Sequence, residues 1–151
     1  MDSKLVNPFL NALKNIFPQL GFENVEKQNV RVKPKNLNKT GVIVSVGVAG
    51  DFEGSVIYYF SKENAKKIAS TMMKQEVTEL SDMAKSALSE LANMLTANAG
   101  VNLSENDVNI NISPPIIMYG NELNFSFNNK KVMSVIINVD EIPVEAIISL
   151  I

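Results

Sequence analysis

Three polar residues in the stretch Ser81–Gly100 have types and a spacing that could support chemistry. Ser86, Glu90 and Asn93 follow one another at i, i+4 and i+7, which is the spacing of side chains on one face of a helix. They supply a hydroxyl, a carboxylate and a carboxamide, groups that can bind a partner or hold a water molecule. The same residues also fit the solvated side of an amphipathic helix, so their surroundings must decide between the two.

The helical periodicity predicts that all three side chains point away from the core. An ideal helix turns by about 100° per residue, which puts them within about 60° of one another and roughly 130° from an apolar stripe. That apolar stripe consists of Leu80, Ala84, Ala87, Leu88, Leu91 and Leu95. The Glu-x-x-Asn pattern recurs at Glu26 and Asn29. We interpret this second copy as accidental, because in a strand its spacing puts the side chains on opposite faces.

The composition narrows the chemistry that is available. The 151-residue chain contains no histidine and no cysteine, which excludes disulfides, thiolate nucleophiles, histidine bases and Cys or His metal sites. An enzyme with this sequence must use carboxylates, amides, hydroxyls or amines, or groups supplied by its partner. The formal net charge is −2, and no nucleic acid is expected as a partner. The most basic run, Arg31–Thr40, contains Pro34 and several asparagines and is predicted to be a solvated loop.

The rest of the chain predicts the elements that must position this helix. Helical spacing over residues 3–17 ends at or just before Pro18, and Ser61 is the predicted N-cap of a helix over 62–73. The long helix is predicted to begin at Thr78 or Ser81 and to end at Gly100 as its C′ residue. Strands are predicted at 25–32, 41–50, 54–60, 106–112, 121–127 and 131–139, and segment 143–151 fits either a strand or a helix.

The order of these elements predicts the fold class. Hairpins are expected between 41–50 and 54–60, and between 121–127 and 131–139 through the asparagine-containing turn 128–130. Gly47 inside its strand indicates a bulge or a close approach by another element. Runs of strands around a helical block indicate an α+β fold, with a largely antiparallel sheet packed against helices and the long helix in mid-chain.

The length and hydropathy predict one domain over residues 1–151. A hydrophobic content of 46% over 151 residues is enough for a single core. No secretion signal is visible, and no apolar run approaches the roughly 20 residues that span a membrane. These features predict a cytoplasmic protein without a membrane partner.

The pattern Ser86-x-x-x-Glu90-x-x-Asn93, followed by "SPP" ending at Pro115, resembles the signature of the CheC/CheX/FliY family. These are bacterial chemotaxis phosphatases that dephosphorylate the response regulator CheY. Pro115 lies one residue nearer to Asn93 than in the family pattern, and Pro114 fits slightly less well. The segments "GDFEGSVIYYFSKENAKKIASTMM" and "ISPPIIMYGNEL" also resemble family segments, so the likeness covers most of the chain. Only one helix carries the pattern, which looks more like CheX than CheC, and the length leaves no room for the switch domain of FliY.

This resemblance implies a protein phosphatase that hydrolyses the aspartyl phosphate of a phosphorylated CheY-like response regulator. Asn93 would be the catalytic residue that positions the attacking water, and Glu90 would contact a lysine of the regulator. Ser86 would lie at the edge of the contact, or simply be solvated, and Pro115 or Pro114 would shape the neighbouring loop. No cofactor of its own is implied, because the divalent metal (Mg²⁺) belongs to the regulator. Family members of the CheX type are homodimers, and a homodimer is expected here.

Two other functions stay open at this point. A non-catalytic adaptor would bind a receiver domain or a flagellar switch component without hydrolysis, although the intact pair of Glu90 and Asn93 argues against it. An unrelated scaffold or ligand-binding α+β domain would leave the polar face of the helix merely solvated, or buried against the sheet or another subunit.

Overall fold

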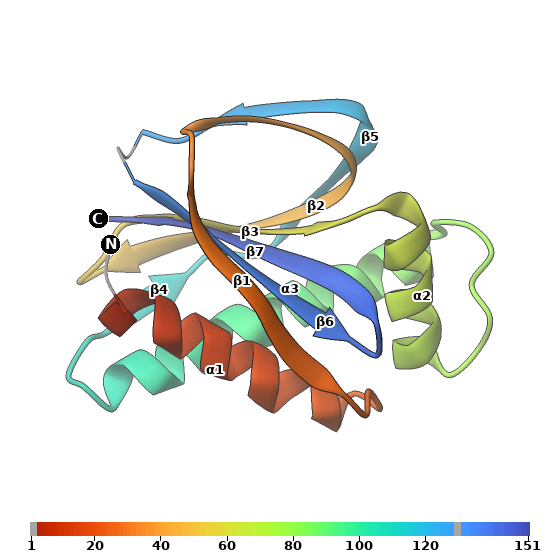
Figure 1. Cartoon of the computed structure of the whole chain (residues 1–151), viewed down its shortest axis with the longest axis horizontal. Coiled ribbons are helices and arrows are strands. Elements are labelled where there is room, and N and C mark those ends of the chain that lie inside the picture. Colours follow the sequence, from red (N-terminus) through yellow and green to blue (C-terminus); the bar gives the residue numbers. More distant parts are fainter. Residues whose placement is uncertain (1–2, 129–130) are drawn as a thin grey trace.

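The computed structural model describes residues 3–128 and 131–151 and has the mixed helices and strands of an α+β protein (Figure 1). The helices are α1 (Ser3–Gln19), α2 (Lys62–Met73) and α3 (Asp82–Ser104). The strands are β1 (Val25–Lys33), β2 (Asn36–Gly50), β3 (Gly54–Phe60), β4 (Ile110–Ile112), β5 (Ile116–Ser126), β6 (Val132–Val139) and β7 (Ile142–Leu150). Within the described residues they form one antiparallel sheet in the order β1-β6-β7-β3-β2-β4, with β5 also paired to β2. The predicted fold class is confirmed.

One face of the sheet is covered by α1 and α3, which lie side by side in Figure 1. Their apolar stripes pack against valine-rich strands, and the side chains of Phe17, Leu91 and Val44 are all fully buried in this core. Burial of each such side chain contributes roughly 2 kcal/mol. The side-chain amide of Asn102 on α3 also donates to the carbonyl oxygen of Pro8 on α1 at 2.9 Å. Helix α3 is therefore held by both the sheet and α1.

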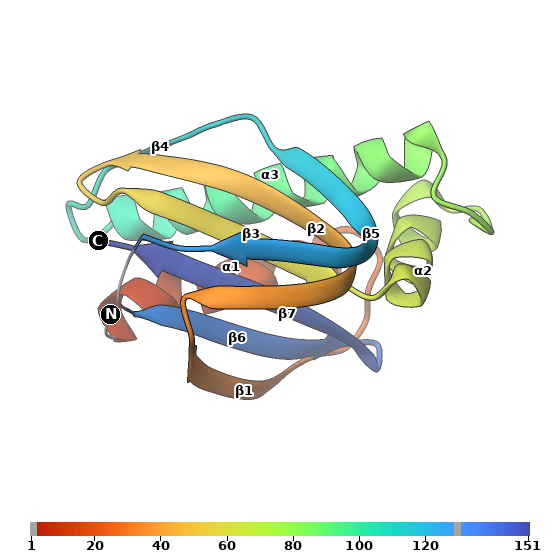
Figure 2. The ribbon, with the colours of Figure 1, turned by 90° about the horizontal axis from the view of Figure 1, so that it is seen from above.

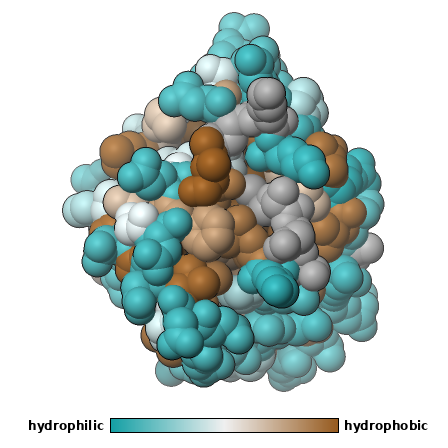
Figure 3. Space-filling model, turned by 90° about the vertical axis from the view of Figure 1, so that its left-hand side faces the viewer, coloured by the Kyte–Doolittle hydropathy of each residue, from teal (hydrophilic) through white to brown (hydrophobic). Residues whose placement is uncertain are grey.

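The opposite face of the sheet is partly covered by a ribbon made of the first part of β2 and the last part of β5 (Figures 1 and 2). The ribbon bends where the pairing shifts register between Lys39 and Gly41. A Cβ atom at Gly41, whose φ is +136°, would lie 2.5 Å from the carbonyl oxygen of Phe60, so glycine is required there. A second apolar cluster is formed by Ile43, Ile57, Phe127, Val132 and Ile147. Viewed from the end at which the C-terminus lies, apolar side chains gather at the centre of the surface, with hydrophilic ones around them (Figure 3).

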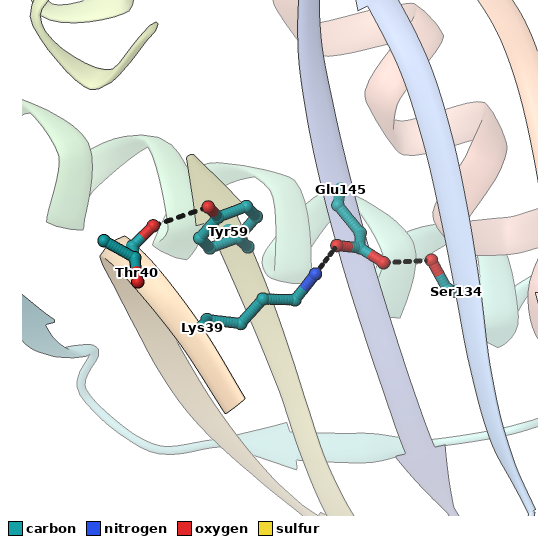
Figure 4. A network of polar contacts seen from close by, with 5 residues as sticks. All are labelled: Lys39, Thr40, Tyr59, Ser134 and Glu145. Atoms are coloured by element: carbon teal, nitrogen blue, oxygen red, sulfur yellow. Dashed lines mark hydrogen bonds and ion pairs between the residues drawn. The ribbon is translucent and has the colours of Figure 1, made fainter. Parts of the chain in front are cut away.

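A buried carboxylate lies between this ribbon and the sheet (Figure 4). One side-chain oxygen of Glu145 is 2.9 Å from Nζ of Lys39, and the other accepts a hydrogen bond from the hydroxyl of Ser134. The same ammonium group lies 4.6 Å from the ring centroid of Tyr59, whose hydroxyl donates to the carbonyl oxygen of Thr40 at 2.6 Å. These contacts join the ribbon to β3, β6 and β7.

Replacing Lys39 by methionine is expected to lower the free energy of unfolding by about 3 kcal/mol. The carboxylate of Glu145, in a residue only 6% exposed, would lose its cation and keep the Ser134 hydroxyl as its partner. Urea unfolding measures the change. The control is Lys66→Met on α2, because Lys66 pairs with the exposed Glu63 and an exposed pair contributes about 1 kcal/mol or less. Equal stabilities of the two variants would contradict the structural role of the buried pair.

Two predictions about the strands are wrong, whereas the hairpin of β2 and β3 is confirmed. The segment Arg31–Thr40, predicted to be a loop, lies mostly in β1 and β2. Its polar residues fit strands because many of them are exposed and Lys39 has a buried partner. The strands at 121–127 and 131–139 form no hairpin, since β5 pairs with β2 and β6 lies between β1 and β7. Of the predicted turn 128–130, residues 129 and 130 lie outside the described residues.

Several predicted boundaries also change. Helix α3 continues past Gly100 to Ser104, so Gly100 is not its C′ residue. A Cβ atom at Gly100 would lie 3.5 Å from the Ile110 side chain, an ordinary contact distance. Pro18 lies within the last turn of α1, which ends at Gln19. The strand predicted at 106–112 shortens to Ile110–Ile112, because a turn that includes Asp107, with a φ of +60°, follows α3. The undecided C-terminal segment is the strand β7.

Candidate active site

Helix α3 presents the three polar residues singled out in the sequence. The hydroxyl of Ser81 accepts a hydrogen bond at 3.2 Å from the backbone N–H of the third helical residue, so Ser81, and not Thr78, is the N-cap. The N-cap predicted for α2, Ser61, is confirmed by a hydrogen bond of the same kind. On the side of α3 away from the core, Ser86 and Glu90 are exposed and Asn93 is half-buried. The outward orientation predicted from the periodicity is confirmed.

An open groove with a volume of about 820 Å³ lies between α3 and the segment that links β4 to β5. Ser86, Glu90 and Asn93 line it from α3, while Pro114 and Pro115 line it from the opposite wall. Seen from above, the link from β4 to β5 runs along α3 (Figure 2). The structure therefore brings every predicted site residue to one groove, and both prolines contribute to it.

The wall that carries the prolines is anchored to β2. The backbone N–H of Ser113 donates to the carbonyl oxygen of Gly47 at 2.9 Å, and the N–H of Gly47 donates to Oγ of Ser113 at 2.7 Å. A Cβ atom at Gly47 would lie 3.0 Å from that Oγ atom, so of the bulge and the close approach expected from a glycine inside a strand, the close approach is confirmed. Because Ser113 directly precedes the two prolines, these bonds fix the wall opposite Asn93.

A buried hydrogen bond ties α3 to the sheet one turn beyond Asn93. The hydroxyls of Tyr58 on β3 and Thr96 on α3 are 2.8 Å apart. Thr96 donates to the carbonyl oxygen of Ala92 at 2.8 Å, so Tyr58 donates to Thr96. Burial raises the pKa of Tyr58 well above its ordinary value, which keeps the phenol neutral. Sequence reasoning missed this pair, although a threonine on the apolar side of a helix could have indicated it.

Replacing Thr96 by valine is expected to lower the free energy of unfolding by about 2 kcal/mol, because the buried hydroxyl of Tyr58 loses its partner. Chemical unfolding measures the loss. The double variant Thr96→Val with Tyr58→Phe is expected to recover part of it, since no polar group is then left unpaired. If the single variant unfolds at the same denaturant concentration as the wild type, the hydrogen bond contributes nothing to holding α3.

The groove also contains a positive charge that sequence reasoning missed. Lys85 lines it, and its Nζ atom lies 3.3 Å from the hydroxyl of Tyr119, 4.7 Å from that ring's centroid and 3.5 Å from a carboxylate oxygen of Asp82. The hydrogen bond to Tyr119 is the main cause of a raised pKa of Lys85. The spacing of Asp82 and Lys85 is readable in the sequence, whereas the contact with Tyr119 depends on how β5 is placed.

The side chains that line the groove determine what it can do chemically. Within residues 3–128 and 131–151, no cluster of three or more potential metal-ligating side chains is placed to hold a metal ion. In the same residues, no helix is long and apolar enough to cross a membrane. The groove offers an exposed carboxylate at Glu90 and a half-buried carboxamide at Asn93. Such groups can pair with a cation and hold a water molecule.

Comparisons with known proteins agree with the fold and place the chain in a family. A model of the family described as chemotaxis phosphatase CheX matches residues 42–138. The CheY-P phosphatase CheX of Thermotoga maritima is 33% identical over 125 residues, which cover 82% of this chain and 80% of that protein. The chain therefore belongs to the CheX family of chemotaxis phosphatases.

Solved structures extend the likeness over nearly the whole chain. The CheX–CheY–BeF3–Mg²⁺ complex of Borrelia burgdorferi matches with a TM-score of 0.80 and 28% identity, over 97% of both chains. A chemotaxis protein CheX from Desulfovibrio desulfuricans matches with a TM-score of 0.87 and 21% identity, over 98% of this chain and 99% of the other. At 21% identity, the match to the Desulfovibrio protein shows a shared fold.

Proposed function

We propose that this protein is a phosphatase that hydrolyses the aspartyl phosphate of a phosphorylated CheY-like response regulator and so ends a chemotaxis signal. The observation that carries the proposal is the placement of Glu90 and Asn93 beside one groove on the outward face of α3. The chain belongs to the CheX family, and its Thermotoga relative is named a CheY-P phosphatase. The Borrelia relative is seen in a complex with CheY, which supports a regulator of this kind as the partner.

Asn93 is the proposed catalytic residue. An aspartyl phosphate is a mixed anhydride and is already activated, so hydrolysis chiefly needs a water molecule held in line with the leaving oxygen. A carboxamide can donate to or accept from that water without a change of charge. The half-buried position of Asn93 limits its motion, and the fixed wall at Ser113 closes the opposite side of the groove.

Glu90 is the proposed contact with the regulator. It lies one helical turn before Asn93 and is exposed, so its carboxylate is available to a lysine of the partner. A carboxylate and an ammonium group that lose water together form a strong, charge-assisted contact. This contact would set the position of α3, and with it the amide of Asn93, over the phosphoryl group.

Three further residues have supporting roles in the proposal. Ser86 is exposed one turn before Glu90, at the edge of the contact. Pro114 and Pro115 both line the groove, where they shape the wall and take no part in the chemistry. The divalent metal, Mg²⁺, belongs to the regulator in this proposal, and it neutralises phosphoryl charge there.

A homodimer and a cytoplasmic location complete the proposal, both from the family resemblance. The apolar strand β6 offers no reason for a dimer, because β1 and β7 pair with its two edges. The sheet ends at β1, where Val32 is 63% exposed. Sedimentation equilibrium measures the oligomeric state, and cell fractionation measures the location.

A panel of phosphorylated receiver domains tests the function. Each receiver is phosphorylated, freed of its phosphate donor, and its remaining phosphate is followed with and without this protein. We expect at least one receiver to lose phosphate faster when the protein is present. Tight capture of a phosphorylated receiver with an unchanged phosphate lifetime would instead favour a non-catalytic adaptor.

A further inference from the structure

Lys85 lies at one end of the groove, beyond the residues given roles above. The segment opposite α3 runs antiparallel to the helix, because Ile110 approaches Gly100 while Tyr119 contacts Lys85. Lys85 precedes Asn93 by eight residues, or about 12 Å along the helix axis. A side chain at that separation contacts the partner's surface beside the reacting group, and not the group itself.

The contacts of Lys85 hold it in place without satisfying its charge. Its carboxylate neighbour, Asp82, is fully exposed, with the two charged atoms 3.5 Å apart, and a pair of this kind adds little to stability. Its hydrogen-bond partner, the hydroxyl of Tyr119 at 3.3 Å, is neutral, and the Tyr119 ring lies 4.7 Å from the ammonium nitrogen. An incoming carboxylate would form a stronger, charge-assisted bond with the same ammonium group.

The charges of the groove indicate why such a bond is needed. Among the described residues that line it, Lys85 is the one cation, and Asp82 and Glu90 are the acids. A phosphorylated regulator presents carboxylates and a phosphoryl group around the reaction centre. These groups are repelled by Asp82, and by Glu90 wherever it is not paired with the regulator's lysine. A cation at the groove's end offsets this repulsion and favours one orientation of the partner. Tyr119, which is 55% exposed, adds an aromatic surface of the kind enriched in protein interfaces.

We propose that Lys85, held against the ring of Tyr119, binds a surface carboxylate of the regulator beside its phosphorylation site and so selects and orients the partner on α3. The inference rests on the proposed function, because it takes the partner to be a phosphorylated response regulator. Lys85 is a specificity residue in this account. Asn93 keeps the chemistry, and Glu90 keeps the central contact.

The experiment compares Lys85→Glu with Lys66→Glu as its matched control. Lys66 on α2 pairs with Glu63 at the same i, i+3 spacing, and its side chain is 17% exposed against 22% for Lys85. Both reversals therefore create a similar like-charge pair, but only Lys85 lines the groove. The probe is the receiver domain that the wild type binds most tightly when activated by beryllium fluoride and Mg²⁺, where beryllium fluoride stands in for the phosphoryl group.

We expect Lys85→Glu to raise the Kd for this receiver, and the KM for its phosphorylated form, by about tenfold or more, with kcat unchanged. The Kd should also become less sensitive to salt. Lys66→Glu should leave Kd, its salt dependence, KM and kcat at their wild-type values. Tyr119→Ala should raise Kd by a smaller factor. Reversal of one acidic residue beside the phosphorylation site of the receiver should restore binding to Lys85→Glu.

Equal Kd values and equal salt dependence for the two lysine variants would overturn the inference. The binding measurement separates this failure from that of the proposed function. A wild type that binds the activated receiver without accelerating phosphate release would refute the phosphatase, while the Lys85→Glu comparison would still decide the docking contact. A wild type that neither binds nor dephosphorylates any receiver would overturn both.

Discussion

Asn93→Ala is expected to lower kcat for phosphate release by about 100-fold or more, the usual cost of removing one fixed polar group that acts in the transition state. The affinity for the activated regulator should change little, because the central contact belongs to Glu90. The variant should fold as the wild type does, since alanine has the higher helix propensity, by some tenths of a kcal/mol. Single-turnover decay of a phosphorylated receiver, with the protein in excess, measures the chemical step.

The matched control for this variant is Asn98→Ala. Asn98 lies on the same helix and makes an exposed hydrogen bond with Asn15 at 3.4 Å. It is not among the residues that line the groove, so its loss should leave kcat unchanged. Full activity of Asn93→Ala would remove the assigned role of the amide. A parallel loss in both variants would point to a disturbed helix and not to a missing catalytic group.

Glu90→Lys is expected to raise the Kd for the activated regulator by at least about 30-fold, because loss of a buried charge contact costs about 2 kcal/mol or more. Reversal of the charge adds repulsion from the lysine proposed as its partner. The phosphate release rate at low receiver concentration should fall with the affinity. Calorimetry or fluorescence titration with the beryllium fluoride form of the receiver measures Kd directly.

The control for the second variant is Glu105→Lys at the far end of α3. Glu105 is exposed and lies just beyond the last residue of the helix, Ser104, where a lysine is compatible with the helix dipole. Unchanged affinity in Glu105→Lys, together with weakened binding in Glu90→Lys, places the effect in the groove. Wild-type affinity in Glu90→Lys would mean that the carboxylate does not meet the partner.

Local patterns in the sequence were enough to predict the helix that carries the site. The period of the apolar stripe indicates which way Ser86, Glu90 and Asn93 face. Ser81 caps the helix by accepting a hydrogen bond from the backbone N–H three residues later. Gly47 indicated a bulge or a close approach, because glycine inside a strand often marks one of these, and the contact with Ser113 shows the close approach. Each of these features depends on residues near one another in the chain or on a single steric requirement.

Features that join distant parts of the chain were not predictable in the same way. The pairing of β5 with β2, and not with β6, depends on packing of the whole sheet. The asparagine-containing turn between β5 and β6 therefore led to the wrong prediction of a hairpin. The contact between Lys39 and Glu145 spans 106 positions. The contact of Lys85 with Tyr119 spans 34 positions. A hydrophobic or charge pattern within one segment does not indicate which distant strand or side chain that segment will contact.

The most direct test of the central claim is the number of phosphoryl groups released per chain when a phosphorylated receiver is in large molar excess. The account predicts many turnovers by the wild type with at least one receiver, and a rate close to spontaneous decay with Asn93→Ala. A phosphate lifetime that the wild type leaves unchanged for every receiver, or release that stops at one phosphate per chain, would contradict it.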